Sequence, residues 1–304
     1  MTIAFLGLGN MGGPMAANLV KAGQKVTGYD PVIAARERAS AGGVAVTDTA
    51  AVAIAGAEVV ITMLPSGAHV LDCYRELVPA AKPGTLFVDC STIDVADARE
   101  AAALATGAGH RAVDAPVSGG VVGADAATLT FMVGGDTKAF HDAEIHLRHM
   151  GARIIHCGGS GAGQAAKICN NMILGVSMIA VAEAFVLGEK LGLTHQALFD
   201  VASTASGQCW ALTTNCPVPG PVPTSPANRD YNGGFASGLM LKDLRLARAA
   251  ARDQNVATLL GEDAAELYAA FVAHDGPRRD FSAIITAVRD GLFANGLSSK
   301  DVTE

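Results

Sequence analysis

The first part of the chain alternates short apolar runs with segments whose apolar residues recur at helical spacing. The apolar runs predict β-strands at residues 2–6, 25–29, 59–63, 86–90, 111–114, 130–133 and 153–156. Helical patterns fall between most of them, as at 15–22, 68–79 and 94–106. Short apolar strands separated by helices are typical of a mainly parallel, doubly wound sheet, which binds ligands at the carboxyl ends of its strands. The pattern therefore predicts an α/β domain.

The second part of the chain has a different pattern. One long helix is predicted at about residues 163–193, without a proline and apolar on nearly every face, as in a helix buried on all sides. Polar residues between 170 and 183 should make it too polar to cross a membrane. Only helical patterns follow, and the polar residues 295–304 should fray. We expect an α/β domain at 1–162 and an all-helical domain at 163–304, joined by the long helix.

Composition and charge narrow the function classes. The chain has 304 residues, 50% of them hydrophobic and 17% charged, which suffices for two domains with substantial cores. Its net charge of -7 argues against a nucleic-acid surface, so local groups would have to bind any anionic ligand. The six cysteines show no Cys-x-x-Cys spacing and suit reduced thiols, and the first residues show no secretory pattern. We expect a cytoplasmic protein with a small-molecule ligand and no membrane or nucleic-acid partner.

A glycine-rich turn follows the first predicted strand. Gly7, Gly9 and Gly12 form G-x-G-x-x-G, with Asn10 and Met11 before the third glycine, and a helical pattern begins directly afterwards. Missing side chains in such a turn let the backbone approach a pyrophosphate, and the helix dipole favours that anion. The setting of strand, turn and helix predicts a Rossmann-type dinucleotide-binding domain.

An acidic residue ends the next predicted strand. Asp30 lies 18 residues past Gly12 (30 − 12), where a carboxylate accepts hydrogen bonds from both ribose hydroxyls and repels a 2′-phosphate. The alternative is a strand-ending turn residue before Pro31. The first interpretation predicts NAD rather than NADP as the cofactor.

Two further groups of residues suggest a substrate site. Ser118, Gly119 and Gly120 follow a predicted strand and could form a nest of N–H groups for a carboxylate, although a bare turn fits the same residues. Lys167 and Asn171 share one face of the long helix because they are four residues apart. A lysine in an apolar helix can simply extend its ammonium group to water. A nicotinamide enzyme, however, needs a group that handles the alcohol proton, and Lys167 is the best-placed candidate.

Other chemistries find no support in the sequence. None of the four tyrosines has a lysine four residues on, so the Tyr-Lys acid/base pair of many alcohol-oxidising enzymes is missing. His141, Glu144, His146 and His149 have helical spacing that could suit a metal, but they lie in a polar helix and are expected on a solvated face. We therefore expect no metal site.

Eight segments together resemble the β-hydroxyacid dehydrogenase family. They occur in the family's order over nearly the whole chain: Gly7-Leu-Gly-Asn-Met-Gly12, Thr62-Met-Leu-Pro65, Cys90-Ser-Thr-Ile-Asp94, Asp114-Ala-Pro-Val-Ser-Gly-Gly120, Leu129-Thr-Phe-Met-Val-Gly-Gly135, Gly163-Gln-Ala-Ala-Lys-Ile-Cys-Asn-Asn-Met172, Asn215-Cys-Pro-Val-Pro-Gly220 and Lys242-Asp-Leu244. The double asparagine and the Pro-Val-Pro-Gly loop are similar to the branch that acts on 3-hydroxyisobutyrate, whereas the cofactor glycines and Lys-Asp-Leu are shared with other branches.

The resemblance implies roles for particular residues. Lys167 would be catalytic, and substrate would be bound by Ser118, Gly119, Gly120, Asn171 and Lys242. The cofactor would be bound by Gly7, Gly9, Asn10, Met11, Gly12, Asp30, Leu64, Pro65, His69, Thr92, Phe235 and Lys242. His69 departs from the family, which often has asparagine there. The resemblance also implies that helical domains associate into a homodimer or homotetramer.

The expected activity is NAD-dependent oxidation of a short 3-hydroxy acid. Trp210 and Phe235 could provide an apolar wall that accepts a methyl group at carbon 2, which favours 3-hydroxyisobutyrate over glycerate. A sister activity, such as tartronate semialdehyde reductase or 3-hydroxypropionate dehydrogenase, would use the same machinery. A non-catalytic NAD-sensing or scaffold protein is the alternative from another class, but it would not need a proton carrier at residue 167.

Overall fold

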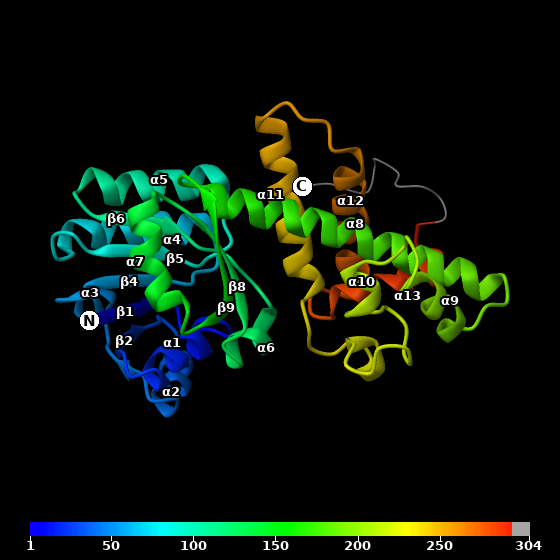
Figure 1. Ribbon diagram of the computed structural model, residues 1–304, viewed down its shortest axis with the longest axis horizontal. Coiled ribbons are helices and arrows are strands. Elements are labelled where there is room, and N and C mark those ends of the chain that lie inside the picture. The colour runs from blue at the N-terminus through cyan, green and yellow to red at the C-terminus, as the bar shows by residue number, and fades with distance from the viewer. Residues whose placement is uncertain (294–304) are drawn as a thin grey trace. The chain divides into compact units, whose positions relative to one another are not determined.

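The computed structural model describes residues 1–293, which form two compact units: Met1–Lys167, and the chain from Ile168 onward (Figure 1). The first unit is a mostly parallel sheet with helices on both faces, and the described part of the second is helical. The predicted fold class is therefore confirmed. Residues 295–304, for which fraying was predicted, lie outside the described residues.

The sheet of the first unit has nine strands. They are β1 (Thr2–Leu6), β2 (Lys25–Tyr29), β3 (Ala45–Val46), β4 (Val59–Thr62), β5 (Leu86–Asp89), β6 (Arg111–Asp114), β7 (Val117–Ser118), β8 (Leu129–Gly134) and β9 (Gly151–Gly158). The order is β3-β2-β1-β4-β5-β6-β8-β7, with β9 beside β8. The first six strands are parallel, while β8 runs antiparallel to β6 and β7 and parallel to β9. The strand order reverses between β1 and β4, and ligands bind at such a switch point in doubly wound sheets.

Helices cover both faces of this sheet because its strands are apolar on both sides. One face carries α1 (Gly12–Lys21), α2 (Ile33–Ala41), α6 (Gly120–Asp125) and α7 (Thr137–Leu147), and the other carries α3 (Ala50–Ile54), α4 (Gly67–Leu77) with η1 (Val78–Ala80), and α5 (Val95–Gly107). In β1, Ile3 and Phe5 pack into the first layer while Ala4 and Leu6 pack into the second. This alternation follows from the two-residue period of a strand.

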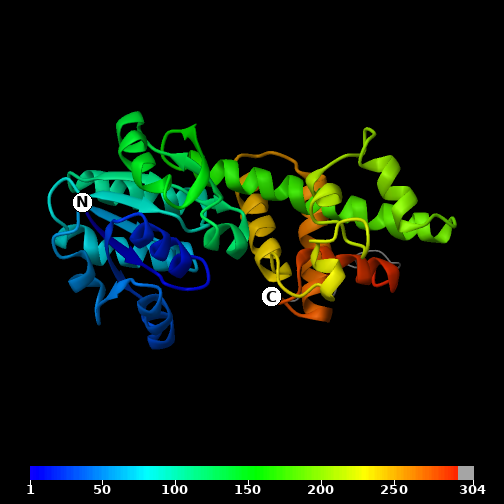
Figure 2. The same cartoon turned by 60° about the horizontal axis from the view of Figure 1, so that its bottom comes forward.

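The second unit is built around α8 (Ala162–Lys190), which starts in the last residues of the first unit. The other helices are α9 (His195–Ala202), α10 (Trp210–Thr213), η2 (Pro226–Arg229), α11 (Ser237–Asp253), α12 (Leu259–Asp275), η3 (Phe281–Ala283) and α13 (Ile284–Arg289) (Figure 2). Met178 and Phe185 of α8 pack with Tyr268 and Phe271 of α12 in a closed apolar core. Between residues 168 and 293 the only β-pairing is an isolated bridge.

Three sequence expectations about helices need correction. The long helix is not buried on all sides, because Ile173 and Leu187 are 66% and 60% exposed. It is also not too polar for a membrane, since α8 is long and apolar enough to cross one. Core helices of soluble proteins have the same composition, and the packing of Met178 and Phe185 favours that interpretation. His146 of α7 is buried at 2% exposure and does not lie on a solvated face.

Candidate active site

The glycine turn between β1 and α1 combines tight packing with an open space. Gly7 has φ 93°, and a Cβ there would collide with the carbonyl oxygen of Met63. A Cβ at Gly12 would collide with the carbonyl oxygen of Gly7, whereas one at Gly9 would meet no atom within 4 Å. The first and third glycines are therefore required by the backbone, and the second leaves room for a ligand. Together with the exposed Asn10 and half-buried Met11 at the start of α1, this turn fits the pyrophosphate of NAD.

Asp30 is fixed beside this turn, at the end of β2. Its Oδ2 accepts a hydrogen bond from Leu8 N at 2.8 Å, and its Oδ1 accepts one from Val32 N at 2.8 Å. The bond from Val32 N fits the alternative raised by the sequence, in which Asp30 is a turn residue that ends the strand. The bond from Leu8 N holds the carboxylate against the glycine turn. Each oxygen retains a lone pair, so the arrangement also fits a ribose diol.

The segment after β4 holds three of the residues expected to contact the cofactor. Leu64 N donates to Ser91 Oγ at 2.8 Å, which joins the ends of β4 and β5. Pro65 and His69 are exposed, and His69 Nδ1 lies 2.7 Å from Ser66 Oγ at the start of α4. This hydrogen bond orients the His69 ring.

A buried carboxyl group lies beneath these loops at the end of β5. Asp89 is 3% exposed, and its Oδ1 accepts from Thr62 Oγ1 at 2.7 Å and from Ser91 Oγ at 2.6 Å. Within the described residues its Oδ2 has no hydrogen-bond partner. Burial raises the pKa of Asp89 to about 6, although the hydrogen bonds from Ser91 and Thr62 oppose that rise. The sequence analysis did not select Asp89, but an acid that ends an apolar strand was a usable signal.

Asp114 at the end of β6 holds the start of α8. Its Oδ1 accepts from Gly161 N at 2.7 Å and its Oδ2 accepts from Gln164 N at 2.9 Å. A carboxylate at this position satisfies N–H groups that lack partners within the helix and interacts favourably with the helix dipole. Burial raises the pKa of Asp114, against the opposing effect of these hydrogen bonds. The motif containing Asp114 was recognised, but this role was missed.

Gln164 connects the same helical turn to the segment after β5. Its Nε2 donates to Ser91 O at 2.7 Å, and its Oε1 accepts from Ile93 N at 3.2 Å. The side chain is fully buried. These two bonds bracket Thr92, one of the residues expected to contact the cofactor. Sequence reasoning missed Gln164, because a buried glutamine has no distinctive spacing.

The expected carboxylate nest opens to solvent next to β7. Gly119 and Gly120 have φ 131° and 61°, which favours glycine at both positions, and α6 begins at Gly120. A Cβ at Gly120 would meet no atom within 4 Å. Ser118 and Gly120 are half-buried and Gly119 is exposed, so N–H groups and a hydroxyl are accessible to a small anion.

Lys167 and Asn171 lie one turn apart on α8, at the end of the first unit and the start of the second. They are 6% and 1% exposed. In the second unit, Asn171 Nδ2 donates to Asp243 Oδ2, and Asn171 Oδ1 accepts from Asn170 Nδ2 at 2.9 Å. Asp243 is 2% exposed, while Lys242 is half-buried. The contact between Asn171 and Asp243 joins residues 72 apart in sequence and was not foreseen.

Two aromatic residues expected to shape the site lie in the second unit. Phe235 is half-buried, its N donates to Asp280 Oδ2 at 2.7 Å, and its ring centroid lies 5.8 Å from that of Phe281. Trp210 begins α10 and is 52% exposed. Phe235 is therefore held in place by its backbone, and the Trp210 ring presents a large apolar surface.

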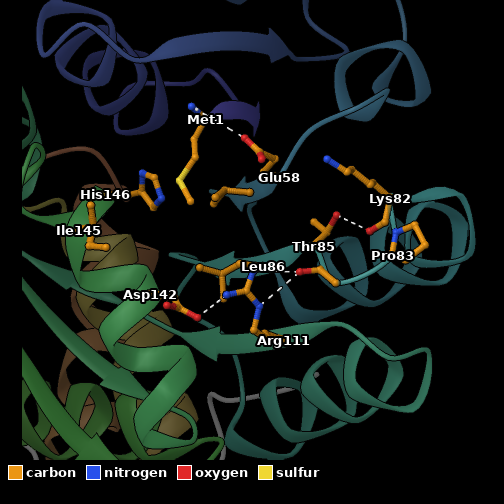
Figure 3. Close-up of a pocket in the computed structure, with 12 residues that line it drawn as sticks. Met1, Glu58, Lys82, Pro83, Thr85, Leu86, Arg111, Asp142, Ile145 and His146 are labelled. Carbon is orange, nitrogen blue, oxygen red and sulfur yellow. Dashed lines mark hydrogen bonds and ion pairs between the residues drawn. The ribbon is translucent and has the colours of Figure 1, made fainter.

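A separate pocket of about 170 Å³ lies at the opposite edge of the sheet, where strands begin (Figure 3). Its walls include Met1, Glu58, Thr85, Arg111 and His146. None of the residues singled out above as ligand contacts lies in it. Among residues 1–293, no group of three or more His, Cys, Asp or Glu side chains could hold a metal ion.

Family models match both parts of the chain. Residues 2–159 match the NAD binding domain of 6-phosphogluconate dehydrogenase, and residues 161–288 match a model described as NAD-binding of NADP-dependent 3-hydroxyisobutyrate dehydrogenase. The first match contains the glycine turn and Asp30, and the second contains Lys167 and Asn171.

Individual relatives agree with these models. A probable 3-hydroxyisobutyrate dehydrogenase from Mycobacterium tuberculosis is 59% identical over 288 residues, covering 95% of this chain and 98% of the relative. A solved structure described as M. tuberculosis 3-hydroxyisobutyrate dehydrogenase with L-serine is also 59% identical, has a TM-score of 0.92, and matches over 95% of this chain and 99% of its own. An NAD-dependent L-serine dehydrogenase from Pseudomonas aeruginosa is 45% identical, covering 93% of this chain and 96% of the relative.

Proposed function

Because the chain belongs to the 3-hydroxyisobutyrate dehydrogenase family of NAD-dependent oxidoreductases, we propose that it oxidises 3-hydroxyisobutyrate to methylmalonate semialdehyde, a step of valine catabolism. The observation that carries the proposal is Lys167, a buried lysine that precedes Asn171 by one helical turn. Removing a proton from a primary alcohol requires such a positioned base.

Each residue has a defined task in this reaction. NAD, when bound, would supply the acceptor for the hydride of the carbinol carbon. Lys167 Nζ accepts the hydroxyl proton as the carbonyl forms, and in the reverse direction it returns that proton to the oxygen. Asn171 holds the reacting hydroxyl, and the segment Ser118–Gly120 binds the carboxylate. These assignments favour a 3-hydroxy acid, which offers both a carboxylate and a reacting hydroxyl.

The remaining residues keep the roles that the family resemblance implies. Lys242 is assigned to the nicotinamide and substrate, and Phe235 to the cofactor. Leu64, Pro65, His69 and Thr92 are assigned to the cofactor on the loops that follow β4 and β5. The hydrogen bond from Leu64 N to Ser91 Oγ supports this assignment, because it holds the two loops together.

L-Serine is a second candidate substrate, since L-serine is named for two of the relatives. It carries an ammonium group at carbon 2, where 3-hydroxyisobutyrate carries a methyl group. An apolar wall gains roughly 1 kcal/mol from the methyl group, whereas an ammonium group would need hydrogen-bond acceptors there.

The test is a panel assay of NAD reduction with 3-hydroxyisobutyrate, L-serine, glycerate and 3-hydroxypropionate. We expect kcat/KM for 3-hydroxyisobutyrate to exceed each of the others by about tenfold or more, a ratio that one methyl group can supply. A higher kcat/KM for L-serine would make that activity the correct assignment. A higher value for glycerate or 3-hydroxypropionate would favour a sister activity, as would faster reduction of tartronate semialdehyde in the reverse direction.

We also propose a cytoplasmic homodimer or homotetramer that associates through the second unit. Leu187, Leu191 and Val201 at the end of α8 and in α9 are 60%, 72% and 66% exposed, and an interface between second units could cover such apolar side chains. The six cysteines are free, in agreement with a reducing compartment. Light scattering on the purified protein would test the association, and a monomer would contradict it.

A further inference from the structure

Gln164 links two segments to which the proposed function assigns different tasks. One is the loop that contains Thr92, and the other is the helical turn that leads to Lys167. All of these residues lie in the first unit. We propose that Gln164 is a positioning residue that sets the place of the Thr92 loop relative to Lys167, and therefore controls the hydride-transfer step.

The chemistry of the Gln164 amide suits this task. One side chain supplies both a donor to Ser91 O at 2.7 Å and an acceptor for Ile93 N at 3.2 Å. The glutamine amide carries a neutral donor and an acceptor on one planar group, and the asparagine amide does the same on a side chain that is one methylene shorter. The side chain is fully buried, so water cannot replace either bond without rearrangement.

The backbone of Gln164 is fixed independently of its side chain. Its N–H donates to Asp114 Oδ2 at 2.9 Å, which ties it to the end of β6. Gly163 packs so closely that a Cβ there would collide with Met132 O and crowd Asp114. The turn therefore has little freedom to move, and Lys167 follows three residues later on the same helix.

The loop at the other end of this link is also held. Ser91 Oγ donates to Asp89 Oδ1 and accepts from Leu64 N, so Ser91 connects the Thr92 loop to the loop after β4. Gln164 therefore connects the loops after β4 and β5, which are assigned to the cofactor, to α8, the helix that carries Lys167. We expect that removing its two bonds would leave both parts folded and loosen the connection between them.

The inference rests on the proposed roles of Lys167 and Thr92, and the experiment separates the two. The test variant is Gln164→Met, which keeps the length of the side chain and removes both hydrogen bonds. The matched control is Thr85→Val at the opposite edge of the sheet. Thr85 is 2% exposed and donates to Lys82 O at 2.6 Å, so the control also loses a buried side-chain hydrogen bond (Figure 3).

Three quantities are measured on the purified full-length proteins: the melting temperature, the dissociation constant for NAD by calorimetry, and the single-turnover rate of NADH formation at saturating NAD and 3-hydroxyisobutyrate, or L-serine if that is the better substrate. We expect Gln164→Met to slow NADH formation about tenfold while the dissociation constant for NAD changes less than threefold. Thr85→Val should lower the melting temperature comparably and keep its rate within twofold of wild type.

A Gln164→Met rate within twofold of wild type would overturn the inference, even if the affinity for NAD became tenfold weaker. If Gln164→Met does not fold, Gln164→Glu keeps the acceptor for Ile93 N, and its rate should fall at least threefold; a wild-type rate would overturn the inference. If Lys167→Ala retains wild-type activity, the proposed function itself fails, whatever the Gln164 variants do.

Discussion

The two edges of the nine-stranded sheet use charged residues in opposite ways. At the edge where strands begin, Arg111 pairs with Asp142, and both side chains are 35% exposed. Glu58 lies 3.8 Å from the amino group of Met1, again at the surface. At the edge where strands end, Asp89 and Asp114 are each 3% exposed, and their carboxylates accept hydrogen bonds from hydroxyl and backbone N–H groups.

The exposed ion pairs where the strands begin are typical of a protein surface, whereas the buried carboxyl groups where the strands end are typical of a functional site. Exposed ion pairs contribute about 0–1 kcal/mol each and serve mainly solubility. Buried carboxyl groups lose hydration, which raises the pKa of both Asp89 and Asp114. Groups with perturbed pKa values gather at functional sites because chemistry requires arrangements that stability alone would not retain. Substitutions at the edge where the strands end (the carboxyl edge) should therefore affect activity and stability more than substitutions at the edge where the strands begin (the amino edge).

The largest expected effect comes from Lys167. Lys167→Ala should lower kcat by ~10² to 10⁴, because a positioned acid/base contributes about that much, while NAD binding stays within a few-fold. Lys82→Ala is the control, since Lys82 is an exposed lysine at the amino edge. Steady-state assays and NAD titration of both variants would measure the difference. Retention of more than a tenth of the activity by Lys167→Ala would show that the lysine is not the acid/base.

The second effect concerns the pH dependence of stability. The pKa of Asp89 rises from 3.8 in the unfolded chain to about 6 in the folded protein, so the folded state binds its proton more tightly. Stability from this group is full below pH 4 and is lost as the pH rises through 6. The loss is about 3 kcal/mol, because the shift is roughly two pKa units.

Asp89→Asn removes this titration and keeps an oxygen for the hydrogen bonds from Thr62 and Ser91. Relative to wild type, its free energy of unfolding should increase by about 3 kcal/mol between pH 4 and pH 7. Urea unfolding at several pH values would measure this change. If the difference in unfolding free energy between variant and wild type did not vary with pH, the raised pKa of the buried Asp89 carboxyl group would be contradicted.

Sequence patterns identified the strands and the cofactor turn because those features are local. The predicted strands at 2–6, 25–29 and 111–114 coincide with β1, β2 and β6. The two-residue strands β3 and β7 were missed, since such short segments carry no periodicity. Their places are set by pairing with β2 and β8.

The polar connections of the site could not be foreseen in the same way. Gln164 lies 73 residues from Ser91, and Asp114 lies 47 residues from Gly161, so both contacts depend on how the sheet brings strand ends together. The sequence indicated which loops would meet at the carboxyl edge, because parallel strands end there. Which side chains bind one another across those loops depends on packing.

The third expected effect concerns the preference for NAD over NADP and its dependence on Asp30, the acid at the end of β2. We expect the wild-type enzyme to prefer NAD over NADP by at least tenfold in kcat/KM, a difference of ~1.4 kcal/mol, because the carboxylate repels a 2′-phosphate. Asp30→Asn keeps one acceptor oxygen, for either Leu8 N or Val32 N, removes the negative charge, and should reduce this preference. Kinetics with both cofactors would decide. Equal use of NADP by the wild type would contradict the expected preference for NAD. It would instead agree with the family that residues 161–288 match, which is described as NADP-dependent.

The smallest effect is expected at the amino edge, for the ion pair between Arg111 and Asp142. Asp142→Asn removes one charge while Arg111 Nη2 keeps its hydrogen bond to Gly84 O at 2.9 Å. Because both side chains are about one-third exposed, the free energy of unfolding should fall by less than about 1 kcal/mol, and less still in 1 M salt. Its value of kcat should equal that of wild type. Asp89→Asn is the same chemical change at the other edge, so measuring both variants in parallel isolates the effect of burial. If Asp142→Asn lowered the free energy of unfolding by several kcal/mol, or lowered kcat tenfold, the edge where strands begin would be as sensitive as the edge where strands end.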